Sequence, residues 1–505
     1  MTACDCAVAA TAEGEVAEEA IPESKLGTDE HGLPGIAYLS GAWLRSSDRL
    51  QPVVDPEDGS LIAEVHNAGS DDIAAAVSGV YESLSSEWEL WQRREALDRA
   101  TVLVREEAAR LAGIIALESS KTITEADREV ARAAETLRLS AANVHLLEGE
   151  TLPLADTARG AGRIGWNRRA PLGVVAAITP FNDPLNLVAH KLGPSLIAGN
   201  GVVLKPSRET PLSALALVDI LLRAGVPAGR IAVSVTDREA GESLVTDPRI
   251  AVVSFTGGPS TADIIAAQAG ARKLLMELGG NNAVIVCEDG ELELAADGIV
   301  DGAFGVAGQN CLSVQRVYVH RSQFKAVVEL VRERTERLVV GSKRNPATDL
   351  GPLIREDEAR RVEEWVSEAK AAGATVVTGG VRTGSFFAPT VLTDVPLGSR
   401  VLREEVFGPV VSILPFSELS DVVSSVNDTE YGLQAGVFTT SMQTAFAVAE
   451  QLHVGSVLIN DTSDYRIDSM PFGGSKRSGV GREGVPSAIL ELSEPKNVIV
   501  SGLAG

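Results

Sequence analysis

The sequence predicts an α/β protein built on parallel sheets, and two observations support this class. Between residues 174 and 270, short apolar runs alternate with longer stretches in which apolar residues recur every three or four positions. The first pattern is typical of strands buried on both faces, and the second is typical of amphipathic helices that cover a sheet. The length of 505 residues also allows more than one domain.

The first elements can be assigned in chain order. Residues 1–35 are acidic and rich in Ala, Glu, Gly and Pro, which predicts a disordered extension. Residues 38–43 predict a strand and a turn, and the Ala-rich stretch from Asp71 to His145 has the apolar spacing of helices. Two strands are expected within 149–170, around a turn at Arg159 to Gly162.

Residue 174 begins the alternation on which the fold prediction depends. Strands are expected at 174–178, 201–205, 231–235 and 252–255, and helices at 185–198 and 212–224. The last of these strands leads into Thr256-Gly257-Gly258 and a further helix. A strand, a glycine turn and a helix start are typical of a Rossmann-like half that binds a dinucleotide.

A second α/β half follows, from about Asn281 to Gly479. Its expected strands include 283–286 and 316–319, and residues 497–500 could form a strand that adds to another chain. No internal repeat and no long linker separates the halves. We therefore expect a tight interface between them, with the functional site at that interface.

Composition limits the classes of partner. The net charge of −24 argues against nucleic acid and anionic membranes, because both attract basic surfaces. Four cysteines are too few for a disulfide framework in a chain of this length. Cys4 and Cys6 could form a weak metal or redox pair, although two incidental thiols are the simpler interpretation. Neither a membrane span nor a secretory signal is expected, which predicts a cytoplasmic protein.

Cys311 is the candidate nucleophile. It follows Gly308-Gln309-Asn310, and a small turn of this kind can expose a reactive thiol. Glu277, in the separate segment Glu277-Leu278-Gly279-Gly280, is the candidate base. A single cysteine is more often a buried small apolar side chain, so the prediction depends on the pair and on the motifs around it.

Seven motifs in order give the strongest signal. They are Thr179-Pro180-Phe181-Asn182, Gly199-Asn200 with Val203-Leu204-Lys205-Pro206, Phe255-Thr256-Gly257, Glu277-Leu278-Gly279-Gly280, Gly308-Gln309-Asn310-Cys311, Glu404-Glu405-Val406-Phe407-Gly408-Pro409 and Pro471-Phe472-Gly473-Gly474. Together they resemble the aldehyde dehydrogenase superfamily from about residue 38 onward. The loop Asp464-Tyr465-Arg466-Ile467-Asp468 is similar to lactaldehyde, non-phosphorylating glyceraldehyde-3-phosphate and phosphonoacetaldehyde dehydrogenases.

The resemblance implies a domain organisation. An NAD(P)-binding domain would span 36–148 and 169–279, and a catalytic domain would span 280–480. Residues 149–168 and 481–505 would form a small β oligomerisation element that joins chains into a homodimer or homotetramer.

The resemblance also assigns chemistry. Attack by Cys311 on an aldehyde would create an oxyanion, held by the Asn182 amide and the Cys311 backbone N–H. After hydride transfer to NAD or NADP, Glu277 would activate the water that hydrolyses the thioester. No metal is required. Taken singly, Asn182 could simply form a turn before Asp183-Pro184, and Glu277 could be an exposed or helix-capping residue.

Residues implied to hold the cofactor come from the same motifs. They are Thr179, Pro180, Phe181, Lys205, Arg208, Thr256, Gly257, Gly258, Leu278, Glu405 and Phe407. Arg208 departs from many NAD-preferring relatives, which carry Glu at this position. An arginine would favour the 2′-phosphate of NADP, unless Arg208 is only a solvated surface residue. Pro259 to Ala262 also differ from the usual pattern and leave the local cofactor geometry open.

Residues implied to line the substrate tunnel are Arg132, His190, Asn310, Arg466 and Phe472. Two arginines and a histidine favour a short polar or anionic aldehyde over a fatty one. Simple ion pairs remain alternatives, with Asp464 or Asp468 for Arg466 and with Glu129 or Glu135 for Arg132. Asn310 lowers the case for a phosphate and leaves room for hydroxylated aldehydes, because some relatives that act on phosphorylated aldehydes carry Arg there.

The expected activity is NAD(P)-dependent oxidation of a short polar or anionic aldehyde to its acid. A relative that passes the acyl group to coenzyme A is an alternative, although such relatives usually lack the base at Glu277. A catalytically inactive binding or structural protein is the other alternative, and the presence of Cys311, Glu277 and Asn182 argues against it.

Overall fold

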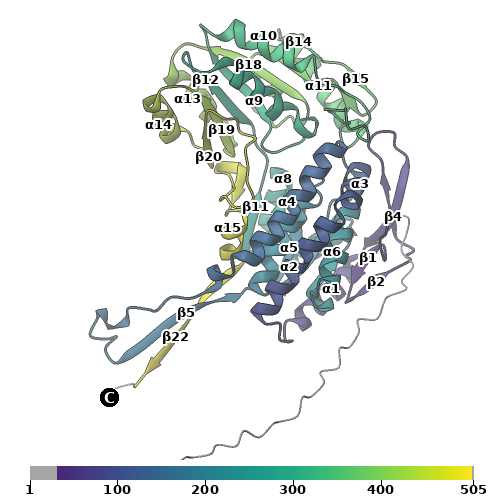
Figure 1. Cartoon of the computed structure of the whole chain (residues 1–505), viewed down its shortest axis with the longest axis vertical. Coiled ribbons are helices and arrows are strands. Elements are labelled where there is room, and N and C mark those ends of the chain that lie inside the picture. Colours follow the sequence, from purple (N-terminus) through teal and green to yellow (C-terminus); the bar gives the residue numbers. More distant parts are fainter. Residues whose placement is uncertain (1–30, 503–505) are drawn as a thin grey trace, which may run out of the picture.

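The computed structural model describes residues 31–502. Two large sheets lie in separate halves, and a narrow two-stranded arm projects from the first half (Figure 1). The part of the predicted extension at residues 1–30, with Cys4 and Cys6, lies outside the described residues. Residues 31–35 depart from the predicted extension, because Leu33 is buried in the first core and ordered packing therefore begins before residue 36.

The first half is built on an eight-stranded sheet of order β2-β1-β8-β7-β6-β10-β11-β21. In this order the strands are Ala42–Leu44, Ala37–Leu39, Ile231–Val233, Gly201–Lys205, Val174–Ile178, Ile250–Thr256, Lys273–Glu277 and Gly479–Val480. The strands from β8 to β11 run parallel. The strands predicted from the continuous apolar runs are therefore confirmed, and β8 ends two residues earlier than expected.

Helices cover both faces of this sheet. They are α1 (Ser70–Ser83), α2 (Leu90–Glu106), α3 (Ala108–Glu118), α4 (Ile123–Ala142), α5 (Asn186–Ala198), α6 (Leu212–Arg223), α7 (Arg238–Thr246), α8 (Pro259–Ala269) and α15 (Val485–Glu491). Successive residues of β6 point to opposite faces. Val175 accordingly packs in the core beneath α2 to α6, and Val174 packs in the core beneath α1, α7 and α8.

Smaller elements join this half to its surroundings. A three-stranded sheet contains β3 (Leu50–Val54), β4 (Leu61–Ala68) and β9 (Val235–Thr236). Short 3-10 segments are η1 (Val144–Leu147), η2 (Leu154–Asp156), η3 (Ala228–Arg230), η4 (Gly305–Gly308) and η5 (Lys476–Ser478).

The C-terminal region returns to the first half. Strand β21 pairs with β11, so that Met276 lies opposite Val480 and Glu277 lies opposite Gly479. Helix α15 buries Val485 and Ile489 in the first core. The sequence prediction assigned residues 481–505 as a whole to the oligomerisation element. The structure instead packs α15 on the dinucleotide-type domain, because its apolar face completes the core beside α5.

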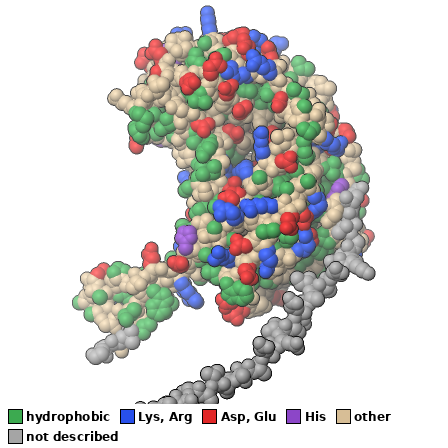
Figure 2. Space-filling model, in the orientation of Figure 1, with side chains coloured by type: hydrophobic (Ala, Val, Ile, Leu, Met, Phe, Trp, Pro, Cys, Tyr) green, Lys and Arg blue, Asp and Glu red, His purple; other side chains and the backbone are tan. Residues whose placement is uncertain are grey.

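The arm consists of β5 (Arg163–Pro171) and β22 (Ser493–Ser501), paired antiparallel along their whole length. Two strands were expected within 149–170. One is β5, whose main partner comes from the C-terminal region of the same chain, and the other is reduced to an antiparallel bridge between Thr151 and Trp166. The expected strand at 497–500 is present in β22, although its pairing here is within the chain. Figure 2 shows hydrophobic side chains on the arm, where Ile164 and Ile499 are more than half exposed.

The second half contains a seven-stranded sheet of order β14-β17-β18-β13-β12-β19-β20. The strands are Thr375–Thr378, Thr390–Thr393, Val410–Phe416, Val314–His320, Asn282–Val286, Gln434–Phe438 and Ser456–Ile459. A separate hairpin pairs β15 (Arg382–Thr383) with β16 (Phe386–Phe387). The helices are α9 (Leu292–Phe304), α10 (Phe324–Thr335), α11 (Glu356–Ala371), α12 (Arg400–Arg403), α13 (Leu419–Asn427) and α14 (Met442–Gln451). None of the helices within 31–502 has the length and apolar character needed to cross a bilayer.

Candidate active site

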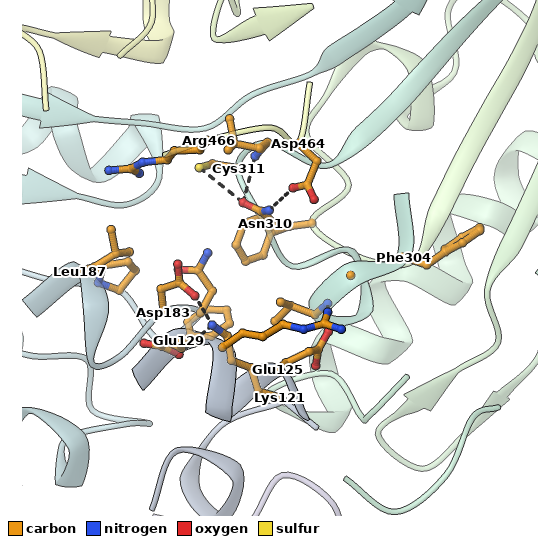
Figure 3. Close-up of a pocket in the computed structure, with 18 of the residues that line it drawn as sticks. Lys121, Glu125, Glu129, Asp183, Leu187, Phe304, Asn310, Cys311, Asp464 and Arg466 are labelled. Atoms are coloured by element: carbon orange, nitrogen blue, oxygen red, sulfur yellow. Dashed lines mark hydrogen bonds and ion pairs between the residues drawn. The ribbon is translucent and has the colours of Figure 1, made fainter. Parts of the chain in front are cut away.

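A cavity of about 770 Å³ lies between the two halves. Its wall is formed by α4 and the loop before it, the loop between β6 and α5, the ends of β10 and β11, the end of α9, and the segments that contain Cys311, Glu405 and Asp464. In Figure 3, Cys311 and Asp464 lie on one side of the open space, and Lys121 and Glu129 lie on the other. Segments far apart in the sequence therefore meet here.

The chain reaches Cys311 through an unusual turn. Val306 and Ala307 both have φ of 52°, a left-handed conformation that side chains with a Cβ rarely adopt. Gly308 follows with φ of 69°, and a Cβ there would lie 2.2 Å from the Gly408 carbonyl oxygen. Glu125 of α4 accepts a hydrogen bond of 2.7 Å from the Val306 backbone N–H. The first half thus holds the turn that presents the thiol.

The Cys311 thiol faces the cavity in a firmly held backbone. The Asn282 amide donates to the Cys311 carbonyl oxygen at 2.7 Å, and the Cys311 sulfur lies 3.8 Å from Asn310 Oδ1. Burial raises the pKa of the Cys311 thiol well above its ordinary value, and the positive charge of Arg466 offsets only part of this effect. The thiol is therefore protonated in the free protein, and its attack requires loss of that proton.

Asn182 lies in the loop between β6 and α5 and lines the same cavity as Cys311. Among the described residues its side-chain amide has no hydrogen-bond partner, so its two N–H donors remain free for a bound molecule. Its neighbour Asp183 is held by Lys121 and Arg132, which fixes the loop that carries the amide.

Glu277 is the last residue of β11, and its side chain also reaches the cavity. Glu277 is only 5% exposed, and its Oε2 has no hydrogen-bond partner among residues 31–502. Burial raises the pKa of Glu277 well above its ordinary value, the Glu483 carboxylate raises it further, and Lys191 lowers it. A carboxyl group with an unpaired buried oxygen has the character of a poised base.

Behind Glu277 lies a buried ion pair. Lys191 Nζ donates to Glu483 Oε1 at 3.0 Å, and both side chains are almost fully buried. Burial alone would raise the pKa of Glu483, but Lys191 and other nearby cations hold it well below its ordinary value. Glu483 is therefore a fixed negative charge beside Glu277.

A second charged network forms the wall opposite the thiol. Lys121 contacts both Asp183 and Glu129, with 2.7 Å between its Nζ and Glu129 Oε2. Glu129 Oε1 also accepts hydrogen bonds from the backbone N–H groups of Leu185 and Asn186 at the start of α5. This carboxylate at a helix N-terminus connects α4 to α5 and orders the loop between them.

Arg132 and Arg466 line the cavity, and each is partly neutralised. Arg132 donates to Asp183 at 3.3 Å and to Asp468 at 3.0 Å. Arg466 donates to Glu483 at 2.9 Å. None of the ion pairs considered in the sequence analysis forms. Asp468 was considered as a partner of Arg466, but it pairs with Arg132.

His190 is placed differently from the prediction. It was assigned to the tunnel wall, but its side chain is fully buried in α5 and does not line the main cavity. Its Nε2 lies 2.9 Å from Asp468 Oδ1 and 3.4 Å from Arg466. Burial lowers the pKa of His190, so the contact with Asp468 is a hydrogen bond of the neutral ring. His190 therefore orients Asp468 behind the wall.

Two further predicted residues lie beside the thiol. Asn310 donates a hydrogen bond of 2.6 Å to Asp464, and its Oδ1 accepts one of 3.1 Å from the Leu312 backbone N–H. Phe472 is buried at the edge of the cavity, and the guanidinium of Arg466 stacks over its ring.

Most of the predicted cofactor residues line the same cavity as Cys311. They are Pro180, Phe181, Thr256, Gly257, Gly258, Leu278, Glu405 and Phe407. The rings of Phe181 and Phe407 form an edge-to-face pair with centres 5.7 Å apart. Glu405 accepts from the Gly280 backbone N–H at 2.8 Å, and burial raises the pKa of Glu405 to about 7.

Features at the carboxyl ends of β6 and β10 fit a dinucleotide. The hydroxyl oxygens of Thr179 and Thr256 are buried without a hydrogen-bond partner in the described chain. Gly258 caps α8, whose free N–H groups favour a phosphate. In an open parallel sheet, nucleotides bind at this edge of the strands.

Lys205 and Arg208 lie away from the cavity wall. Lys205 is at the end of β7, next to β6, and burial lowers its pKa. Arg208 is exposed, and its Nε donates to Gln51 Oε1 at 2.9 Å. Within residues 31–502 no cluster of three or more His, Cys, Asp or Glu side chains is arranged to hold a metal ion.

Several cavity residues were missed by the sequence analysis. They are Lys121, Glu125, Arg128, Glu129, Asp183, Asp464 and Glu483. Asp183 is next to the Asn182 motif and Asp464 lies in the loop quoted for Arg466, so proximity to a motif could have identified both. Glu125, Arg128 and Glu129 occur in a sequence typical of an ordinary helix surface. Lys121 and Glu483 lie in the segments before α4 and α15, and only the fold turns all five toward the cavity.

Comparison with known proteins agrees with this arrangement. A model described as "Aldehyde dehydrogenase family" matches residues 43–498. A 3-sulfolactaldehyde dehydrogenase of Priestia megaterium is 43% identical over 465 residues, covering 92% of this chain and 97% of the relative. Aspartate-semialdehyde dehydrogenase 1 of Pseudomonas canavaninivorans is 41% identical, covering 89% and 96%. The structure of an NADP-dependent glyceraldehyde-3-phosphate dehydrogenase from Bacillus halodurans with NADP superposes with a TM-score of 0.90 at 33% identity, covering 92% and 99%. These matches confirm the resemblance and the fold class drawn from the sequence.

Proposed function

The chain belongs to the aldehyde dehydrogenase family, and from that premise we propose that it oxidises a short aldehyde with an acidic tail, using NAD or NADP. The observation that supports this most strongly is the meeting of Cys311, Asn182 and Glu277 in one cavity from three separate segments. A thiol, an amide with free donors and a buried carboxyl are the groups that oxidation through a thioester requires.

Cys311 is the nucleophile in this proposal. The Cys311 S–H proton passes through water to Glu277 and on to solvent, the sulfur bonds to the aldehyde carbon, and the electron pair of the carbonyl bond moves to oxygen. The Asn182 side-chain N–H and the Cys311 backbone N–H stabilise the resulting oxyanion. A bound nicotinamide supplies the acceptor for the hydride that leaves this carbon. A thioester to Cys311 is then left in the cavity.

Glu277 is the general base for the second stage. Its unpaired oxygen accepts a proton from water, which attacks the thioester carbon and releases the acid and the Cys311 thiol. The partner-free Oε2 favours this hydrolysis over transfer to coenzyme A, because a carboxyl group that merely fills space would be hydrogen-bonded.

The cofactor would lie along the carboxyl edge of the first sheet. Thr179, Thr256 and the N-terminus of α8 would hold its polar groups, and Glu405 and Phe407 would position its nicotinamide end. Lys205 and the exposed Arg208 would lie toward its adenosine end. Arg208 favours use of NADP, because a guanidinium matches a phosphate with two parallel hydrogen bonds.

The acidic tail is supported by the cavity wall and by the relatives. Arg128 and Arg132 are one turn apart on α4, and both line the cavity together with Arg466. Arg128 has no ion pair among the described residues, and its charge acts on Asp301 without a direct contact, so its guanidinium is available to a ligand. Relatives named for 3-sulfolactaldehyde and aspartate semialdehyde act on aldehydes that carry a sulfonate or a carboxylate.

We also propose that the protein is a homodimer or homotetramer assembled through the arm. The support is that Ile164, Trp166 and Ile499 expose apolar surface on β5 and β22, away from the body of the chain. Light scattering of the purified protein that gives a stable monomer would contradict this.

The function is tested by the absorbance of reduced nicotinamide with NAD or NADP and four aldehydes. Three of them, 3-sulfolactaldehyde, aspartate semialdehyde and succinic semialdehyde, carry an acid, and octanal does not. We expect turnover with an acidic aldehyde, its abolition in Cys311→Ala, and full activity in Cys287→Ala, whose cysteine is buried away from the cavity. Turnover of octanal alone would contradict the acidic tail, and no turnover at all would favour an inactive relative.

A further inference from the structure

The proposed chemistry gives no role to Asp464, although hydrogen bonds connect this carboxylate to the nucleophile Cys311 through a single residue. Its Oδ1 accepts a hydrogen bond of 2.6 Å from Asn310 Nδ2, and Asn310 Oδ1 lies 3.8 Å from the Cys311 sulfur. Asp464 therefore stands one amide group away from the thiol. Figure 3 shows this chain of contacts, with the second oxygen of Asp464 directed toward the open space.

Most other carboxylates of the cavity have partners or a role, and Asp301, which has no partner within 31–502, is exposed to solvent. Glu129, Asp183 and Glu483 pair with lysine or arginine side chains. Glu125 and Glu405 accept backbone N–H groups, at Val306 and Gly280. Asp464 differs, because Asn310 is its single hydrogen-bond partner within 31–502 and no lysine or arginine there pairs with it.

A polar group with an open position in a partly dry cavity requires a donor from the ligand or from water. The Asn310 amide cannot turn to supply a second donor, because its oxygen is fixed by the Leu312 backbone N–H. Asp464 Oδ2 is consequently an acceptor held in one place in the cavity that contains the Cys311 thiol.

We propose that Asp464 recognises a hydroxyl group on the carbon next to the aldehyde carbonyl, so that the preferred substrates are 2-hydroxyaldehydes. This rests on the proposed function, because it requires the carbonyl to be bound at Cys311. With the carbonyl there, the first substituent along the chain lies beside the Asn310–Asp464 pair. The tail continues toward Arg128 and Arg132 on the opposite wall.

The surroundings of Asp464 suit a neutral donor. Burial raises the pKa of Asp464 to about 7, Arg132 lowers it, and Asp183, Asp301 and Asp461 raise it further. Near neutral pH the group therefore exists in both forms, and either form can hydrogen-bond a hydroxyl. A fully ionised carboxylate would instead repel an acidic substrate.

The experiment compares lactaldehyde with propanal, which differ by one hydroxyl on the same three-carbon chain. We expect kcat/KM for lactaldehyde to exceed that for propanal by at least about tenfold, with a clear preference for one lactaldehyde enantiomer. In Asp464→Leu both preferences should fall to nearly one. Each preference is a ratio within one variant, so a general loss of activity from the release of Asn310 cancels. In Asp464→Asn, which keeps an acceptor, most of the preference should remain.

Asp461→Asn is the matched control, because it removes a nearby exposed negative charge without touching the cavity. It should retain the preference of the parent protein. The proposal is overturned if the parent protein does not distinguish lactaldehyde from propanal, or if Asp464→Leu is active and keeps both preferences. The first criterion needs no variant, so misfolding of Asp464→Leu leaves a decisive test. Failure of the proposed function is a separate result, since no aldehyde in either panel would then be oxidised.

Discussion

The guanidinium of Arg466 lies 3.8 Å from the centre of the Phe472 ring, and the same guanidinium donates to Glu483 at 2.9 Å. The ring and the carboxylate together hold a planar cation at the cavity wall, only 8% exposed. Its Nε is buried without a partner in the described chain, so part of its donor set remains unused.

Replacement of Arg466 by Lys tests whether this planar cation reads the substrate tail. Lysine keeps the charge but loses the stacking and the fork of donors. We expect kcat/KM for an acidic aldehyde to fall about tenfold more than that for propanal. Phe472→Leu should shift the ratio in the same direction by less. Equal losses of kcat/KM for both aldehydes would show that Arg466 stabilises the cavity wall and does not bind the substrate tail.

Glu277→Gln separates the two stages of the reaction. Glutamine has the same shape but cannot accept a proton from water, so thioester hydrolysis should slow by about 10²- to 10⁴-fold. In stopped-flow absorbance we expect a rapid burst close to one reduced nicotinamide per active site, followed by a very slow steady state. Unchanged steady-state turnover would exclude Glu277 as the base.

The pH dependence of kcat follows from the environment of Glu277. Burial and Glu483 raise its pKa, and a base acts only when deprotonated, so activity is lost as pH falls through this raised value. The acidic limb should thus lie well above the ordinary range of a glutamate. Because Lys191 lowers the pKa of Glu277, Lys191→Gln should move the limb to higher pH. Profiles of kcat from about pH 5 to about pH 10 measure the acidic limb in the parent protein and in the variant. An acidic limb at the same pH in both proteins would contradict its assignment to Glu277.

The buried pair of Lys343 and Asp55 joins the two halves and should contribute strongly to stability. Neither side chain is exposed, their charged atoms lie 2.8 Å apart, and Lys343 also donates to the carbonyl oxygens of Leu117 and Ser119. Lys343→Met leaves Asp55 with the half-exposed Arg344 as its only cation and with the Glu57 backbone N–H, so we expect a loss of about 3–5 kcal/mol, visible as a lower midpoint of thermal unfolding.

Two controls define that result. Arg344→Gln should cost less than Lys343→Met, because Arg344 is half exposed and Asp55 keeps its buried ion pair with Lys343. The double variant Lys343→Met with Asp55→Leu should recover much of the loss, since no buried charge then remains unpaired. A Lys343→Met protein as stable as its parent would refute the importance of the pair.

Arg208→Gln tests the choice of cofactor. The exposed guanidinium is held by Gln51 and would contact the 2′-phosphate of NADP. We expect kcat/KM for NADP to fall by about tenfold while that for NAD stays constant. Arg337→Gln, at an exposed site on the second half, serves as the control. An equal effect on both cofactors would mean that Arg208 does not recognise the phosphate.

The parallel core could be predicted from the sequence because its strands are continuous apolar runs. Val174 to Ile178 and Gly201 to Lys205 needed no knowledge of their neighbours to be recognised. The pairing of β22 with β5 and of β21 with β11 was not predicted. Strands β21 and β22 lie in the C-terminal region, and pairing between strands so far apart in the sequence leaves no local pattern.

The meeting of Cys311, Glu277 and Asn182 in one cavity agrees with the motif order, while their roles stay predictions. His190 was misplaced because a helical residue in an apolar stretch can face a tunnel or a neighbouring carboxylate. The structure turns His190 toward the buried Asp468, and this orientation depends on how the helices pack, which the local sequence does not reveal. Asp464 lies in the loop quoted for Arg466, but its contact with Asn310 joins residues 154 positions apart, and only the fold brings these two together.

The edge strand β21 has a consequence for how the protein is made. Gly479 and Val480 pair with the end of β11, where Glu277 lies, and they leave the ribosome only after the entire second half. The N-terminal half can collapse during translation, but the edge beside the Glu277 carboxyl group stays unprotected until synthesis is nearly complete. A nascent chain stalled before residue 479 would therefore expose this edge to chaperones or to other chains, and thiol-reactive probes would find Cys311 in an unfinished cavity.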